Sequence, residues 1–206
     1  QDYFKTLLNP QTLIISAYGN INEHELISML KPFENHLAKT PQKKPIHTFP
    51  KHTKQTVQHH RQSFDTTSLF MGFNGIPITN LHEKLKLDAV DAVLSGMSYP
   101  GGRLHNKLRD KGYVYLVHGY NFNGTQTGAF YIYALTNETV IDEAYQLILK
   151  EINDIQTKPI TDKEFNDAKA RMRYYYKDQK TSINSQLLVS ATHELYTNKF
   201  NYSEQL

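Results

Sequence analysis

The residues whose types could support chemistry in this chain are ten histidines and one short block rich in glycine, arginine and tyrosine. The sequence contains no cysteine, which excludes disulfides, thiolate catalysis and cysteine-ligated zinc. His59 and His60 are adjacent, so on a strand their side chains would point to opposite faces and could not chelate one ion together. For His105 and His118, a surface or hydrogen-bonded side chain is favoured over an acid/base role. The histidines therefore do not by themselves indicate a catalytic centre.

The block, called here the glycine-arginine block, occupies residues 101–115 and reads GGRLHNKLRDKGYVY. Gly101 and Gly102 stand at the start of a short basic helix. Free backbone N–H groups there could bind an anion, although a plain turn is the favoured interpretation. On spacing alone, Arg103 and Arg109 are solvated charges on this helix. No GxxxxGK[ST] sequence is present, so we do not expect a nucleotide site.

Apolar spacing and turn residues predict the elements that lead up to the block. Asn22, followed three residues later by Glu25, is typical of a capping box at a helix start. In chain order, we expect the tail of a helix at residues 1–8, a buried strand at 13–18, a helix at 22–37, an exposed connector at 39–54, neighbouring strands at 54–62 and 68–76, and a helix at 81–93.

The elements after the block begin with a hairpin. Asn123-Gly124 lies between two runs rich in tyrosine and phenylalanine, which predicts a hairpin over residues 113–135 with a type I′ turn. A helical apolar stripe follows at residues 140–155, and Thr161 with Glu164 forms a second capping box. The order of strand pairs and helices predicts one α+β domain, with a mostly antiparallel sheet and helices packed on one face.

Composition narrows the possible partners. The chain has 206 residues, of which 21% are charged, and its formal net charge is only +3, so no polyanionic partner is required. The lysines at 39–54 lack the interleaved aromatic residues of a nucleic-acid site, and we expect no nucleic-acid partner. No apolar run reaches the length of a membrane span, and we expect no membrane-spanning segment. The compartment stays open, with a bacterial periplasm or cytoplasm as the expected alternatives.

The segment Leu94–Val117, LSGMSYPGGRLHNKLRDKGYVYLV, resembles the pitrilysin/insulinase family of zinc metallopeptidases. In that family a glycine-rich turn leads into a short helix written roughly GGRLxxxLR, and a strand follows near a tyrosine. The segments DYFKTLLNPQTLIISAYGNINEHEL upstream and ALTNETVIDEAYQLILKEI downstream also resemble the family. The resemblance covers residues 1–206 and implies a single non-catalytic domain of the α+β kind, expected to be a fragment of a longer protein.

The catalytic domains of this family carry zinc on a His-x-x-Glu-His motif with a distant glutamate. None of the ten histidines here forms that motif. The resemblance therefore implies that this chain holds no metal and no cofactor, and does not cut peptides alone. Zinc would lie in a partner domain or subunit of the same family, on the same polypeptide or in a homo- or hetero-dimer.

The resemblance also implies the site residues. Family domains without zinc supply an arginine and a tyrosine that contact the peptide substrate, and the matching positions are Arg109 and Tyr115. The spacing between them is one residue shorter than usual in the family, which makes Tyr113 the reserve candidate. Gly101, Gly102 and Arg103 are expected to support the turn. The implied function is substrate contact in a zinc metalloendopeptidase, and the alternative is an assembly domain of the same fold.

Overall fold

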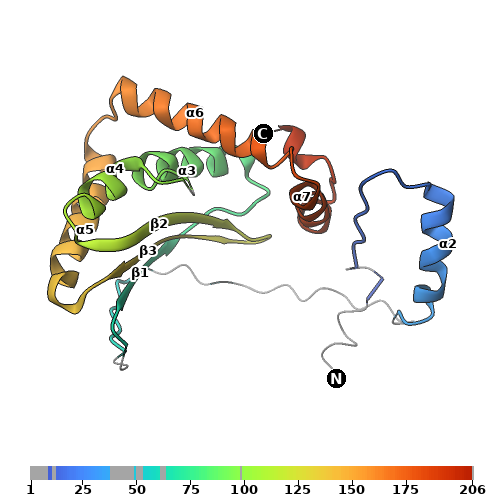
Figure 1. Ribbon diagram of the computed structural model, residues 1–206, viewed down its shortest axis with the longest axis horizontal. Coiled ribbons are helices and arrows are strands. Elements are labelled where there is room, and N and C mark those ends of the chain that lie inside the picture. Colours follow the sequence, from blue (N-terminus) through green and yellow to red (C-terminus); the bar gives the residue numbers. More distant parts are fainter. Residues whose placement is uncertain are drawn as a thin grey trace. The chain divides into compact units, whose positions relative to one another are not determined.

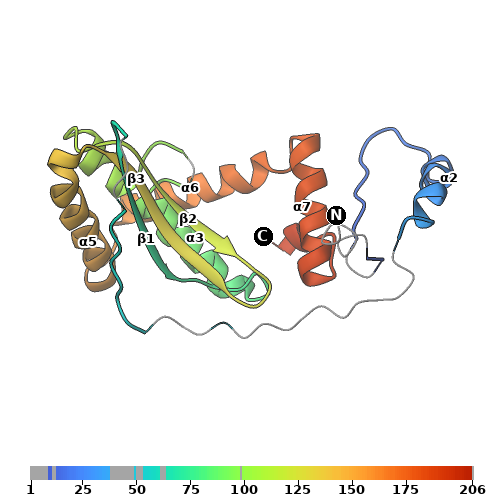
Figure 2. The same cartoon turned by 90° about the horizontal axis from the view of Figure 1, so that it is seen from below.

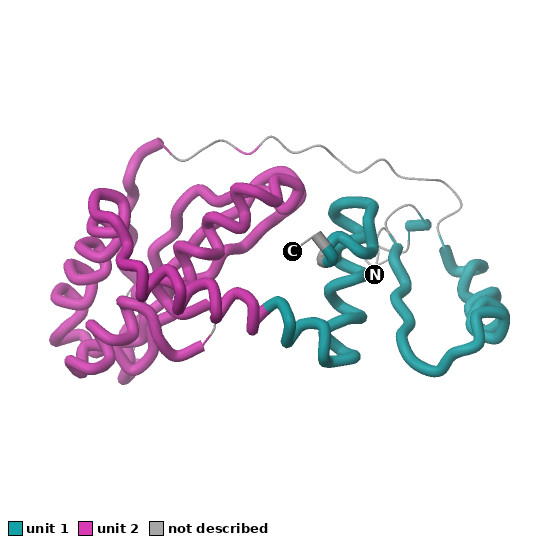
Figure 3. The backbone as a smooth tube through the Cα atoms, turned by 90° about the horizontal axis from the view of Figure 1, so that it is seen from above, with its two compact units in different colours: residues 1–48, 176–206 teal, residues 49–175 magenta. Residues whose placement is uncertain are grey.

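The chain folds into two compact units, which Figure 3 distinguishes by colour. Unit 1 comprises residues 1–48 and 176–206, and unit 2 comprises residues 49–175. The glycine-arginine block lies in unit 2. The computed structural model describes residues 9–10, 13–37, 49, 53–60, 64–97 and 99–205.

The described residues of unit 2 form a three-stranded antiparallel sheet (Figure 1). Strand β3 (Gly128–Thr136) is central, and it pairs with β1 (Thr67–Asn74) on one side and β2 (Val114–Asn123) on the other. Alternate residues of a strand point to opposite faces. In β3, Phe130 and Ile132 are buried, whereas the intervening Tyr131 is only half-buried. The sheet therefore has a core face and a second, more open face.

Helices of unit 2 cover the core face, and Figures 1 and 2 show α3 and α4 on this side of the sheet. These helices are α3 (Leu81–Leu94), the single turn α4 (Gly102–Leu104), the π-helix η1 (His105–Arg109), the 3-10 turn η2 (Glu138–Val140), α5 (Ile141–Thr157) and α6 (Asp162–Asp178), whose last three residues belong to unit 1.

The hydrophobic core lies between the sheet and these helices. Each large side chain that is fully buried stabilises the fold by about 1.5–3 kcal/mol relative to exposure. The buried cluster comprises Leu94, Leu104, Leu108, Val114, Val117, Phe130, Ile132, Ala134, Ala144 and Ile148.

Unit 1 is helical in its described part. Asn22 caps α2 by accepting a hydrogen bond from the backbone N–H of His24, 2.9 Å away. His193 meets Tyr202 edge to face, with ring centroids 5.2 Å apart. The elements are α2 (Glu23–Glu34), α7 (Ile183–Thr197) and the 3-10 turn η3 (Tyr202–Gln205). No helix in the described ranges combines the length and apolar composition needed to cross a bilayer.

The predicted fold class is confirmed, because the sheet is antiparallel and its helices share one face. The helices predicted at 22–37, 81–93 and 140–155 and the strand predicted at 68–76 are also observed, with small shifts at their ends. The predicted helix at 1–8 and most of the connector at 39–54 lie outside the described residues.

Two predicted strands are wrong. Residues 13–18 contain no strand, and Ile15 and Tyr18 are about half exposed. Residues 54–60 also form no strand, and residues 61–62 lie outside the described part. A strand persists only where its backbone N–H and C=O groups find a neighbouring strand, which apolar composition does not provide. The described neighbour of β1 is β3 instead of the predicted segment.

The predicted hairpin is confirmed, but its type I′ turn is wrong. Strand β2 continues to Asn123, which pairs with Gly128, so residues 124–127 form the connection. The N–H of Gly124 donates to the Thr127 carbonyl over 2.9 Å. Neither Asn123 nor Gly124 has the positive φ that a type I′ turn requires. The Asn123 side chain donates to the Ile76 carbonyl over 2.8 Å, and this bond holds Asn123 in the strand.

Candidate functional site

The glycine-arginine block begins at a tight turn after α3. Gly102 has φ +74°, and a Cβ there would lie 2.6 Å from the carbonyl oxygen of Leu94. Both the backbone conformation and this close approach exclude a side chain at position 102. The start of the block is therefore fixed against the end of α3.

Helix α6 contacts the same turn at two points. The Arg171 guanidinium lies against Gly96 and Gly101: a Cβ at Gly96 would lie 2.7 Å from Nη1 of Arg171, and a Cβ at Gly101 would overlap the same group. Tyr99 of the turn meets Tyr174 edge to face, with ring centroids 5.2 Å apart. These contacts depend on glycine, because any side chain at position 101 would displace the guanidinium.

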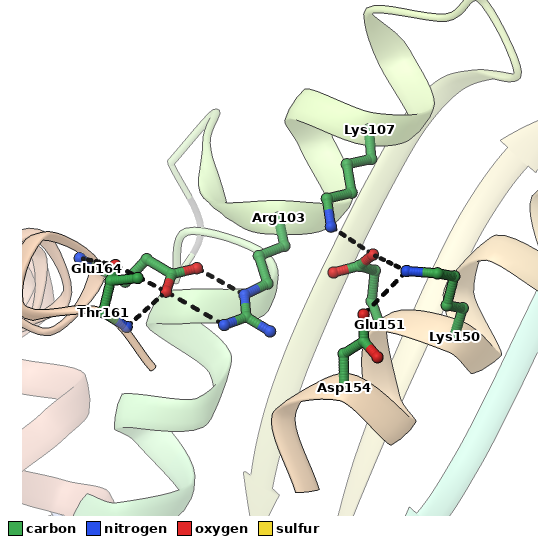
Figure 4. A network of polar contacts seen from close by, with 7 residues as sticks. All are labelled: Arg103, Lys107, Lys150, Glu151, Asp154, Thr161 and Glu164. Atoms are coloured by element: carbon green, nitrogen blue, oxygen red, sulfur yellow. Dashed lines mark hydrogen bonds and ion pairs between the residues drawn. The ribbon is translucent and has the colours of Figure 1, made fainter. Parts of the chain in front are cut away.

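Arg103 joins the block to the start of α6, as Figure 4 shows. Its Nε donates to Oε1 of Glu164 over 2.6 Å, and Nη2 donates to Oε2 over 3.1 Å. Glu164 also accepts from the N–H and hydroxyl of Thr161, so the predicted capping box is confirmed. Hydrogen bonds from Arg103, and then from Thr161, lower the pKa of Glu164 to about 2.

A second group of ion pairs lies between η1 and α5 (Figure 4). Glu151 is 1% exposed, and its Oε1 accepts from Nζ of Lys107 over 2.5 Å. Lys150 lies 3.9 Å from the same oxygen and donates to Asp154 over 2.9 Å. The other carboxylate oxygen of Glu151 is buried without a hydrogen-bond partner among the described residues. Lys107 therefore fixes the side of η1 that faces α5.

Arg109 is the last residue of η1. The short helix predicted over 101–111 is observed, as one α-turn followed by a π-turn, a form often found at functional sites. Leu104 and Leu108 are fully buried, whereas Arg109 is exposed. Nη1 of Arg109 lies 3.3 Å from Nε2 of His105, and within the described part of the chain no carboxylate forms an ion pair with it. The anchored helix thus leaves one guanidinium facing solvent.

Tyr115 occupies a β-bulge. Val114 and Leu116 pair with consecutive residues of β3, so Tyr115 is an extra residue in its strand. Its side chain is 61% exposed. The extra residue also changes the alternation of β2, because Val114 and Val117 are both buried although they are three positions apart. The bulge therefore separates Tyr115 from the core.

Tyr113 has different surroundings. Its half-buried side chain packs against the core cluster, and its carbonyl accepts from the Thr136 hydroxyl over 2.6 Å. The two candidate phenols thus differ in environment. Tyr113 packs against the core, whereas Tyr115 is exposed. The spacing from Arg109 to Tyr115, which is one residue shorter than usual in the family, thus occurs together with a β-bulge at Tyr115.

An acidic cluster lies on the core side of β2. Asp91 of α3 is 5% exposed, and burial raises its pKa to about 6. The Ser95 hydroxyl donates to its Oδ1 over 2.5 Å. A Cβ at Gly119 would lie 2.6 Å from the same oxygen. Asp88 accepts from the Asn121 side chain over 2.8 Å, so two carboxylates join α3 to β2.

Sequence reasoning missed this cluster and the contact of Arg171 with Gly96 and Gly101. The available signal for the cluster was the spacing of Asp88, Asp91 and Ser95, which places three polar residues on one face of a helix. No comparable signal existed for Arg171, because its contact with Gly101 joins residues 70 positions apart.

The described residues do not fit a metal site. No three histidine, aspartate or glutamate side chains in these ranges come close enough to hold an ion. The zinc that the family resemblance implies has no ligand set in this part of the chain.

Residues 1–172 match the family model described as "Peptidase M16 inactive domain". An "Uncharacterized zinc protease" of Rickettsia felis is 26% identical over 167 residues, which cover 80% of this chain and 39% of the relative. The chain thus spans well under half the length of that relative.

Two solved structures are similar in fold. A peptidase M16 inactive domain from Pseudomonas fluorescens aligns with TM-score 0.71 and 20% identity, covering 91% of this chain and 44% of the other. A chain of Complex III2 from Candida albicans aligns with TM-score 0.66 and 16% identity, covering 91% of this chain and 49% of the other. The resemblance predicted from the glycine-arginine block is confirmed, and the chain belongs to the peptidase M16 family as an inactive domain.

Proposed function

We propose that this chain is a single non-catalytic domain of a zinc metalloendopeptidase. It binds extended peptide and assists hydrolysis at a zinc site that another domain or subunit supplies. The observation that carries the proposal is the state of Arg109, whose guanidinium is exposed and has no carboxylate partner in the described chain, although its helix is anchored on the opposite side.

A guanidinium in this state is suited to binding a peptide backbone. It offers several N–H donors in a fixed plane and can donate to a peptide carbonyl. Arg103 is less suited, because both of its observed hydrogen bonds go to Glu164. In this proposal Arg103, Gly101 and Gly102 hold the turn from which η1 presents Arg109.

Tyr115 is the proposed second contact. An exposed phenol can donate to a carbonyl oxygen and to the oxyanion that develops during hydrolysis. The bulge supports Tyr115 over Tyr113, because the Tyr113 side chain packs against the core and would have to leave it to reach a substrate.

The test uses the full-length protein together with its zinc-bearing domain or subunit. Arg109→Ala should raise KM by about tenfold or more, the loss expected for one charged hydrogen bond. Tyr115→Phe should lower kcat by about a hundredfold, as removal of an oxyanion donor does. Steady-state hydrolysis of a fluorogenic peptide measures both values.

Arg173→Ala is the matched control, since Arg173 is an exposed arginine on α6. Its kinetics should equal those of the unmodified protein. Tyr113→Phe removes only the reserve hydroxyl and should leave kcat unchanged. Unchanged turnover in both Arg109→Ala and Tyr115→Phe, with the proteins still folded, would contradict the proposal.

A second candidate function is a structural role in an assembly. The similarity in fold to a chain of Complex III2 from Candida albicans favours it, because that chain belongs to a complex. This function predicts that Arg109→Ala leaves any peptidase activity intact. Surface substitutions would instead release partner subunits, which size-exclusion chromatography of the complex would detect.

A further inference from the structure

We propose that the open face of the unit 2 sheet carries a recognition site for one aromatic or branched aliphatic side chain of the bound peptide. This inference rests on the proposed function, because it assigns a side-chain preference to the same substrate. The site lies on the strands, apart from the Arg109 helix.

The site is an open hollow of about 620 Å³ over all three strands. Tyr131 of the central strand contacts an aromatic ring from each neighbouring strand. Phe70 stacks on Tyr131 with centroids 5.1 Å apart and planes 27° apart, and Tyr120 lies on the other side at 5.3 Å. The hollow is lined by Phe70, His118, Gly119, Tyr120, Tyr131 and Tyr133.

The strand register creates the hollow. Gly72 of β1 pairs directly with Tyr131, so the position beside this ring has no side chain on that strand. A Cβ at Gly72 would meet only Phe70, at 3.9 Å, which means that the space above it is open. Aromatic rings surrounding such a gap form the usual lining of a site for an apolar group.

The lining selects an uncharged ligand group. None of the six lining residues is lysine, arginine, aspartate or glutamate. Burial raises the pKa of Tyr131, so its phenol stays neutral at ordinary pH. A charged side chain would lose its hydration here without gaining a counter-ion.

His118 adds one polar requirement. Its Nδ1 is buried and has no hydrogen-bond partner in the part of the chain that is described. A buried polar atom without a partner is unfavourable, and the ring lines the hollow. If the His118 ring turned toward the hollow, a peptide backbone group could supply the missing partner, which a bare hydrocarbon could not.

The position of the hollow favours a peptide over other apolar ligands. Strand β2 carries both Tyr115 and the lining residues His118 and Tyr120, three and five positions further on. At about 3.3 Å per residue, these positions are roughly 10–17 Å from Tyr115 along the strand. An extended peptide bound at Arg109 and Tyr115 would therefore place a side chain three to five residues away over the hollow.

The test measures binding of short labelled peptides to the full-length protein, with a zinc chelator present to prevent cleavage. The peptides share a Gly/Ser/Thr background and carry Phe, Leu or Glu at successive positions. At the position that reaches the hollow, Phe or Leu should bind about tenfold more tightly than Glu, as burial of one apolar side chain predicts. Fluorescence anisotropy gives the dissociation constants.

Tyr131→Ala should reduce this Phe-to-Glu ratio to nearly one. Tyr120→Ala, an edge-strand change, serves as the second variant if Tyr131→Ala does not fold. Phe122→Ala is the control, because Phe122 lies on the same strand and is 50% exposed but does not line the hollow. The ratio should survive in this control.

The two proposals fail in different ways. Arg109→Ala should weaken all peptides by one common factor and leave the ratio unchanged. If Arg109→Ala weakens binding but Tyr131→Ala keeps the ratio, the hollow is not a recognition site and the proposed function stands. If each peptide bound Arg109→Ala as tightly as it binds the unmodified protein, the proposed function would be overturned instead. A change of sedimentation in Tyr131→Ala would identify the face as a contact between copies and overturn this inference.

Discussion

At the scale of single residues, Asp91 is a buried carboxyl between α3 and β2. Its carboxyl is buried, and it receives one hydrogen bond, from Ser95, beside the backbone of Gly119. Burial raises its pKa to about 6 from an ordinary value of 3.8, with a further contribution from Asp88. Folding therefore favours the protonated carboxyl more than the unfolded chain does.

The first prediction concerns this proton. Between about pH 4 and 6 the folded state keeps a proton that the unfolded state has released, so the free energy of unfolding falls as pH rises, by at most about 3 kcal/mol. Asp91→Asn keeps the acceptor for Ser95 without the charge. It should remove this slope and exceed the unmodified protein in stability at pH 8, as measured by urea unfolding. Asp167→Asn, at an exposed position, should keep the slope, and retention of the slope in Asp91→Asn would refute the assignment.

The second prediction concerns close packing at Gly119. A Cβ there would lie 2.6 Å from Asp91 Oδ1 and 3.0 Å from the Ser95 hydroxyl oxygen. Gly119→Ala should therefore destabilise the fold by about 1–3 kcal/mol, the usual result of overpacking. Gly72→Ala is the control, since its Cβ would enter open space on a neighbouring part of the sheet. Thermal unfolding of both variants should show a lower Tm only for Gly119→Ala.

At the scale of elements, α6 holds the glycine-arginine block. Its first turn accepts both hydrogen bonds of Arg103 through Glu164, and Arg171 further along the helix lies against Gly101. The block is fixed on its other side by the Lys107–Glu151 pair with α5. The exposed Arg109 is thus positioned by contacts that do not involve its own side chain.

The third prediction tests this attachment. Arg103→Met removes the bidentate pair and should cost about 1.5–3 kcal/mol in free energy of unfolding at pH 7. Arg103 lowers the pKa of Glu164 to about 2, so the pair stabilises the fold above the ordinary value of 4.5 and is lost as pH falls toward 2. The difference between variant and unmodified protein should therefore shrink at low pH.

The control for this prediction lies on the same helix. Lys163 and Asp167 form an ion pair 2.7 Å long, but their side chains are 84% and 51% exposed. Lys163→Met should cost less than about 0.5 kcal/mol, because exposed pairs contribute little. If urea unfolding gave equal losses for Lys163→Met and Arg103→Met, the proposed attachment would be incorrect.

At the scale of the whole molecule, the chain corresponds to well under half the length of its zinc-protease relative. It matches the inactive-domain model over residues 1–172 and covers 39% of its zinc-protease relative. Its described residues bring no metal-ligand set together. Peptide contact is the contribution that we propose for this chain.

The fourth prediction follows from the proposal that another domain or subunit supplies the zinc. The purified chain should bind no stoichiometric zinc by elemental analysis and should leave a fluorogenic peptide uncut. Addition or co-expression of the zinc-bearing domain should produce cleavage that Arg109→Ala weakens. One zinc per isolated chain, with activity, would show a free-standing metallohydrolase instead.

The sequence was sufficient for features that depend on local pattern. Helical apolar spacing located α3 and α5, the Thr161–Glu164 capping box located the start of α6, and the glycine-arginine block indicated the family. These signals involve neighbouring residues, whose spacing is written directly in the chain. The order of strand pairs and helices also predicted the α+β class.

The tertiary structure alone decided features that require a partner distant in sequence. The segment at 13–18 has the composition of a strand but no strand forms there, because pairing needs another backbone. The bulge at Tyr115 depends on the register with β3, and the raised pKa of Asp91 depends on burial beneath Gly119. Sequence thus determined the family and most local elements, whereas long-range packing determined which phenol and which guanidinium remain open to solvent.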